Sequence, residues 1–131
     1  MRVRHLRTRA QFQALLGTTA VARTAHFALH RWRPTALPAT PDGDALFQPS
    51  DAVWLGAMTP KRWARRAVTR NAIRRQIYAV GENLTPALQA GAHLVRLRSA
   101  FAPARFPSAA SDALKRAVRD ELLQLFDRGA A

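Results

Sequence analysis

The pattern of apolar and polar residues predicts an amphipathic helix near each end of the chain. Near the start, Thr8 and Gln11 form a capping-box pattern, and Gly17 lies where a C′ residue would end a short helix. Near the other end, Ser111 is placed to cap a final helix. Five apolar residues of that helix recur at helical spacing: Leu114, Val118, Leu122, Leu125 and Phe126. Such a stripe indicates a helix face that packs on a core.

Three segments between these helices have the character of strands. Residues 21–32 are β-like, residues 53–58 form a short apolar run, and residues 92–98 indicate a further strand. Residues 33–50 contain four prolines, which cannot donate to a β ladder, so we expect a loop there. A helix over residues 66–80 completes the set of elements and is described below.

Together these elements predict one α+β domain over residues 1–131. The expected order is α-β-β-(β)-α-β-α, with a sheet of about four strands, a basic N-terminal arm at residues 1–8 and the proline-rich loop at residues 33–50. A length of 131 residues suits a single domain, and a hydrophobic content of 48% is enough for a modest core.

The charge of the chain indicates the class of partner that it binds. The chain has 21 lysines and arginines against 8 acidic residues, a formal net charge of +13. Such an excess favours binding to nucleic acid or, less often, to an anionic membrane surface. The chain has no cysteine, which excludes disulfides and thiolate metal sites. The chain shows no apolar run of about 20 residues and no signal-peptide pattern, so we expect a cytoplasmic protein that is not associated with a membrane.

The positive charge concentrates between residues 61 and 75. Seven of these fifteen residues are cationic and none is acidic. A helix over residues 66–80, ended by Gly81, would place four polar residues on one arc, at about 100° per residue. These are Arg70, Asn71, Arg74 and Arg75. Ala72, Ile73, Ile77 and Val80 would then face the core. The alternative is an ordinary solvated helix face, and a GC-rich genome would also favour arginine over lysine.

Residues 67–75, which read Ala-Val-Thr-Arg-Asn-Ala-Ile-Arg-Arg, resemble the Arg-Asn-Arg core of the protein subunit of bacterial ribonuclease P. The flanking segments are similar in the same order. Residues 9–17 resemble the first helix of that family, residues 54–61 its apolar strand followed by a lysine, and residues 26–30 and 93–98 further strands. The resemblance covers about residues 6–126 and implies a left-handed β-α-β crossover, against the usual handedness.

The chain departs from the family pattern at several positions. Ala72 replaces the third residue of the Arg-Asn-Arg core, and Tyr78 replaces a later arginine. The segment between Lys61 and Ala67 is one residue longer than in the family, and Trp63 with Arg65 or Arg66 would compensate there. These departures concern individual contacts to RNA more than the resemblance to the family as a whole.

The resemblance implies that the protein assists a catalytic RNA, which removes the 5′ leader from precursor tRNA with Mg²⁺ held mainly by the RNA. No catalytic residue and no bound metal are then expected in the protein, and no protein partner is required. Carried over by position, the contacts to catalytic RNA would come from Lys61, Arg62, Arg65, Arg66, Arg70, Asn71, Arg74 and Arg75.

The resemblance also implies a cleft for the leader between the first helix and the sheet. Its residues would be Phe12, Leu16, Phe27, His30, Arg96 and Arg98. His30 would stack on a base, while Leu16 would offer only apolar contact. Core packing is the alternative for Phe12, Leu16 and Phe27, and a solvated strand face is the alternative for the two arginines.

Two other functions compete with this interpretation. One is a standalone RNA- or DNA-binding protein of ribosomal or architectural type. The other is a nuclease that uses Asp42, Asp44 and a histidine, although the sequence around Gly43 is first of all a turn signal. His26 and His30 would lie about 13 Å apart on a strand, too far to share one metal.

Overall fold

Five strands form one sheet in the part of the chain that the structure describes. That part of the computed structural model comprises residues 3–33, 46–49, 51–102, 106, 108 and 111–130. The strands are β1 (Val3–His5), β2 (Ala22–Arg23), β3 (Phe27–Trp32), β4 (Val53–Met58) and β5 (Gly91–Leu97), and their order in the sheet is β1-β4-β5-β3-β2. Strand β4 runs parallel to β1 and β5, whereas β3 runs antiparallel to β5 and β2. The sheet is therefore mixed, with β1 and β2 at its edges.

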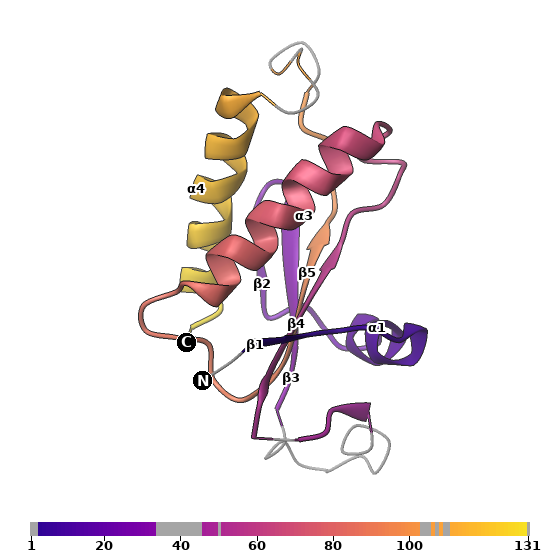
Figure 1. Cartoon of the computed structure of the whole chain (residues 1–131), viewed down its shortest axis with the longest axis vertical. Coiled ribbons are helices and arrows are strands. Elements are labelled where there is room, and N and C mark those ends of the chain that lie inside the picture. Colours follow the sequence, from indigo (N-terminus) through magenta and orange to yellow (C-terminus); the bar gives the residue numbers. More distant parts are fainter. Residues whose placement is uncertain are drawn as a thin grey trace.

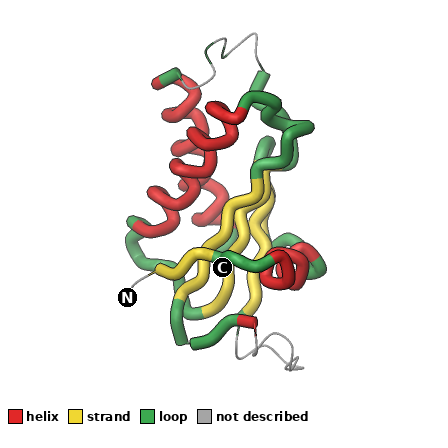
Figure 2. The backbone as a smooth tube through the Cα atoms, turned by 45° about the vertical axis from the view of Figure 1, so that its right-hand side comes forward, coloured by secondary structure: helices red, strands yellow, loops and turns green. Residues whose placement is uncertain are grey.

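In the part of the chain that the structure describes, three helices cover the two faces of this sheet. Helices α3 (Ala67–Glu82) and α4 (Asp112–Arg128) lie side by side on one face, and the short helix α1 (Arg9–Leu16) lies on the other (Figures 1 and 2). Helix α3 connects the neighbouring parallel strands β4 and β5. The handedness of this crossover stays a prediction. The arrangement is that of a single α+β domain.

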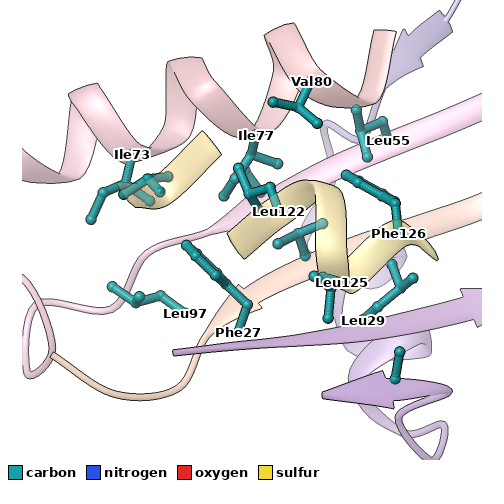
Figure 3. Packing of buried hydrophobic residues seen from close by; sticks show 14 of the residues in the cluster. Phe27, Leu29, Leu55, Ile73, Ile77, Val80, Leu97, Leu122, Leu125 and Phe126 are labelled. Atoms are coloured by element: carbon teal, nitrogen blue, oxygen red, sulfur yellow. The ribbon is translucent and has the colours of Figure 1, made fainter. Parts of the chain in front are cut away.

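The main core lies between the sheet and the α3–α4 layer. Strand β3 contributes Phe27 and Leu29 to it, and the two helices contribute residues including Ile73, Ile77 and Leu122, all of them buried (Figure 3). The apolar stripe predicted for the last helix is buried here, which confirms that prediction. Fully burying side chains of this size stabilises a fold by about 1.5–3 kcal/mol each.

A smaller core lies under α1 on the opposite face. It contains Leu15 of α1, Trp54 of β4, Leu94 of β5 and the fully buried Phe47. The Trp54 indole nitrogen donates to the carbonyl of Pro49 at 3.2 Å. Most of the expected loop, residues 34–45 and 50, lies outside the described residues, but Phe47 shows that its end packs into this core.

Several local predictions are confirmed by the structure. The side chain of Thr8 caps α1 in a capping box with Gln11, and Ser111 accepts a hydrogen bond from the backbone of Leu114 at 3.1 Å. Gly17 ends α1 as predicted, but it is the C-cap with right-handed backbone angles and not a C′ residue. Residues 53–58 form β4 as expected.

Two boundaries differ from the sequence prediction for reasons of packing. Part of the expected basic arm is strand β1, because Leu6 is buried and its backbone nitrogen donates to Leu55, continuing the pairing with β4. Gly81 lies inside α3 and does not end it. A Cβ at Gly81 would lie 2.5 Å from Cδ2 of Leu55, so glycine permits the close approach of α3 to β4.

Candidate RNA-binding surfaces

The first candidate surface is a basic ridge on α3 and on the segment before it. We define this basic ridge as the predicted set: Lys61, Arg62, Arg65, Arg66, Arg70, Asn71, Arg74 and Arg75. All of these residues are exposed except Arg70, which is half-buried. The expected opposite side is buried, since Ala72, Ile73, Ile77 and Val80 all pack inward. The structure therefore brings the predicted residues together on one connected stretch of backbone.

Hydrogen bonds fix the inner part of the ridge. The Arg70 guanidinium donates to the carbonyls of Ala64 and Arg65, at 3.1 and 2.8 Å, and so fastens the preceding segment to α3. The Arg74 guanidinium donates to Oδ1 of Asn71 at 3.1 Å. Asn71 thus orients an arginine of the ridge, and its exposed amide group can still donate to RNA.

No carboxylate among the described residues forms an ion pair with the cations of the basic ridge. In the residues that the structure describes, both ion pairs involve histidines, His5 with Glu82 and His26 with Glu121. Like charges four residues apart on a helix destabilise it by about 0.2–0.5 kcal/mol per pair, as for Arg70 and Arg74. A bound phosphate backbone would remove this repulsion.

Trp63 and Tyr78, which lie at two departures from the family pattern, make defined contacts in the structure. Trp63 is half-buried against the main core, and the Arg62 guanidinium lies over its ring at 5.2 Å from the centroid. Tyr78, at the position of the family arginine, stacks on His5 with ring centroids 4.0 Å apart. Nε2 of His5 lies 2.7 Å from the Glu82 carboxylate, beside a concavity of about 1030 Å³.

The second candidate surface is the face of the sheet on the side of α1, where the resemblance implies the leader cleft, and we use the word cleft for this surface. Phe12 is half-buried against the small core, and Leu16 is 37% exposed beside it. Arg96 and Arg98 alternate with Val95 and Leu97, which belong to the main core, so both arginines point to the α1 face, as expected. These four residues remain candidates for contact with the leader.

The structure corrects the expectation for two further residues of the cleft. Phe27 is fully buried in the main core on the other face of the sheet, so it cannot line the cleft, and core packing is its role. His30 faces the cleft but is only 5% exposed, which leaves no ring face for a base to stack on. His30 is instead a hydrogen-bonding residue within the cleft wall.

The hydrogen bonds of His30 indicate which of its two ring nitrogens carries the hydrogen. Its Nδ1 lies 3.0 Å from the carbonyl oxygen of Thr18, so Nδ1 must carry the hydrogen and donate. Its Nε2 then accepts a hydrogen bond from Nε of Arg96 at 3.3 Å. Burial, together with the charges of Arg96 and Arg23, lowers the pKa of His30 despite the opposing effect of the Thr18 carbonyl. His30 is therefore neutral near pH 7 and holds Arg96 in place.

Arg23 is a residue of this surface that sequence reasoning missed. It is exposed on β2 and points to the α1 face, because its neighbour Ala22 packs into the main core. A strand of two residues is too short to show alternation. No signal in the sequence alone could have found it, because the burial of Ala22 is visible only in the structure.

The structure gives no support to a metal-dependent site in its described part. Among the described residues, no group of three or more histidines, aspartates and glutamates is placed so that it could hold a metal ion. His26 binds Glu121 at 2.6 Å and stacks on Phe101. Asp42 and Asp44, the candidates for a nuclease, lie outside the described residues. None of the described helices is long and apolar enough to cross a membrane.

Comparisons with known proteins agree on one family. A model of the ribonuclease P family matches residues 1–125. The ribonuclease P protein component of Bordetella parapertussis is 37% identical over 119 residues, which cover 91% of this chain and 85% of that protein. That of Ralstonia pickettii is 32% identical over 117 residues, 89% of this chain and 72% of that protein. The structure of the Staphylococcus aureus RNase P protein has a TM-score of 0.67 at 16% identity, covering 96% of this chain and 94% of that one.

An α+β domain with an unneutralised arginine ridge on a helix and further arginines on the opposite sheet face defines a nucleic-acid-binding protein. The matches with known proteins identify one family within this class. The chain belongs to the ribonuclease P family, and it is the protein component of a ribonucleoprotein endonuclease that processes tRNA.

Proposed function

We propose that this chain binds the catalytic RNA of ribonuclease P through its basic ridge and the 5′ leader of precursor tRNA through the cleft under α1. The RNA carries out the cleavage, with Mg²⁺ held mainly by RNA, and the protein supplies no catalytic group. A cytoplasmic location is part of this proposal. The observation that carries it is the ridge itself, seven cations on and before α3 without a neutralising carboxylate among the described residues.

The physical contribution of the protein is charge held on a rigid support. Catalytic RNA and precursor tRNA are both polyanions and repel each other. Ile73 and Ile77 anchor α3 in the main core, and Arg70 fastens the segment before it, so the arginines need little ordering when RNA binds. Arginine also matches phosphate with a planar fork of donors.

A reconstitution experiment tests the proposed function. The purified protein alone should not cut precursor tRNA, and it should increase cleavage at low Mg²⁺ when the cognate RNA is added. Cleavage by protein without RNA would support the nuclease instead. Binding of RNA without any stimulation would support a standalone architectural protein.

A pair of substitutions tests the ridge. Arg74→Gln with Arg75→Gln removes two exposed cations and should weaken binding to catalytic RNA by roughly 100-fold, if each contributes one charge-assisted phosphate contact. The slope of log affinity against log salt should fall by about 1.8 under the rule for duplexes. The matched control, Arg116→Gln with Arg119→Gln, removes the same charge from exposed positions on α4. Equal effects of the two pairs would contradict the assigned interface.

A further inference from the structure

A row of residues crosses the sheet on the α1 face and brings two arginines together. Arg23 of β2 pairs with Ala28 of β3, Ala28 with Arg96 of β5, and Arg96 with Met58 of β4. Neighbouring strands lie about 4.8 Å apart, so the backbones of Arg23 and Arg96 are about 10 Å apart. Only the methyl group of Ala28 stands between them. Two guanidinium groups from these positions can converge on one phosphate above Ala28.

Arg96 is positioned for this role by His30. The Nε hydrogen bond to His30 uses the inner donor of the Arg96 guanidinium and leaves its two terminal nitrogens to face a ligand. His30 is itself held by the carbonyl of Thr18, at the end of α1. The position of Arg96 is thus set by β3 and by the segment that follows α1.

The charged groups that shift the pKa of Arg96 are all cationic. Burial, followed by the charges of Arg98, Arg23 and Arg62, lowers the pKa of Arg96. Arg98 is fixed nearby, since its guanidinium donates to the carbonyl of Thr24 at 2.7 Å. Within the described residues, no carboxylate forms an ion pair with any of them. This repulsion is a standing cost in the free protein that a phosphate would relieve.

We propose that Arg23 and Arg96 form a clamp for one phosphate of single-stranded RNA, with Ala28 as its floor and His30 as the residue that positions Arg96. The RNA is the leader of precursor tRNA, an assignment that rests on the proposed function. Phe12 and Leu16 border the same cleft and offer apolar contact to the adjoining nucleotides.

Arg23→Gln in the reconstituted holoenzyme tests the clamp, because the exposed side chain can be changed without disturbing a core. Affinity for precursor tRNA should fall roughly tenfold, as expected for one charge-assisted contact, while affinity for mature tRNA stays unchanged. The salt slope for the precursor should fall by about 0.7, the value for one phosphate of a single strand. Arg116→Gln on α4 is the control with the same loss of charge.

The pH dependence of leader binding tests the role of His30. Below its lowered pKa, protonated His30 cannot accept from Nε of Arg96, and it faces the charges of Arg96 and Arg23. Affinity for the leader should therefore decrease as pH falls through this lowered pKa, which lies below the ordinary histidine value of about 6.5. Arg96→Gln should remove both the leader contribution and most of this pH dependence, measured by binding and not by cleavage.

The clamp is overturned if Arg23→Gln behaves like Arg116→Gln with both tRNA substrates. If the ridge variant still loses catalytic RNA in the same experiments, the proposed function stands without the clamp. If the ridge variant also behaves like its own control, both the clamp and the proposed function fail. An equal loss for precursor and mature tRNA would place the contact outside the leader and overturn the clamp as well.

Discussion

Replacing Gly81 by alanine tests whether close packing of α3 on β4 determines the position of the basic ridge. Alanine is favoured over glycine inside a helix by about 1 kcal/mol. The added Cβ, however, would lie 2.5 Å from Cδ2 of Leu55, whose side chain is fully buried among the residues of the main core (Figure 3). Overpacking of this kind costs about 1–3 kcal/mol. The net change in the free energy of unfolding should be a loss of about 0–2 kcal/mol.

Urea denaturation of Gly81→Ala, Leu55→Val and the double variant measures this balance. Shortening Leu55 should make room for the new methyl group, so the double variant should be more stable than the sum of the single effects by about 0.5–2 kcal/mol. A Gly81→Ala variant that is more stable than wild type by about 1 kcal/mol would refute the reasoning, because propensity alone would then decide the outcome. Affinity for catalytic RNA, measured on the same variants, shows whether a displaced α3 also displaces the ridge.

Three further predictions concern stability. Burial lowers the pKa of His93 to about 4 from an unfolded value near 6.5, so its contribution to stability is complete above about pH 6.5 and is lost as pH falls to 4, by about 3 kcal/mol. Urea titrations of wild type and His93→Gln across this range should differ in slope, and parallel curves would contradict the assignment. Leu122→Ala opens a cavity in the main core and should cost about 2–5 kcal/mol, whereas the exposed Leu123→Ala should cost far less. Ser111→Ala removes the N-cap of α4 and should cost about 1 kcal/mol by thermal unfolding, with Ser108→Ala as the exposed control.

Features encoded within a few residues could be predicted from the sequence. The caps of Thr8 and Ser111 depend on side chains that bond backbone groups three residues away, and the structure contains both. The arc of Arg70, Asn71 and Arg74 follows from helical geometry alone. Helix faces and helix starts were therefore accessible without any tertiary information.

The two faces of β3 could not be told apart in this way. Residues 27–30 are all buried, because α1 covers one face of the strand and α3–α4 cover the other. A strand buried on both faces shows no alternation of apolar and polar residues. The resemblance to the family implies a place in the cleft for Phe27, and without alternation the sequence offered nothing to correct it. Phe27 lies in the main core, and His30 on the cleft face is buried.

Gly81 and β1 depend on contacts between distant segments. Glycine after a helical pattern is the usual sign of a helix end, but here it makes room for Leu55, some 26 positions earlier in the sequence. Likewise, nothing local distinguishes Val3–His5 from a solvated basic arm, and its strand exists because β4 offers a free parallel edge. Tertiary packing overrides local preference at both places.

The segment between β4 and α3 physically connects the two candidate surfaces. Arg62 belongs to the basic ridge through its place in the chain and its position over Trp63, yet its charge also acts on Arg96 in the cleft. Trp63 in turn packs on the main core, which supports α3. The cations of the two surfaces are thus held in a fixed relation by one short segment. Under the proposed function, such a connection would set the positions of the catalytic RNA and the leader against each other and not only against the protein.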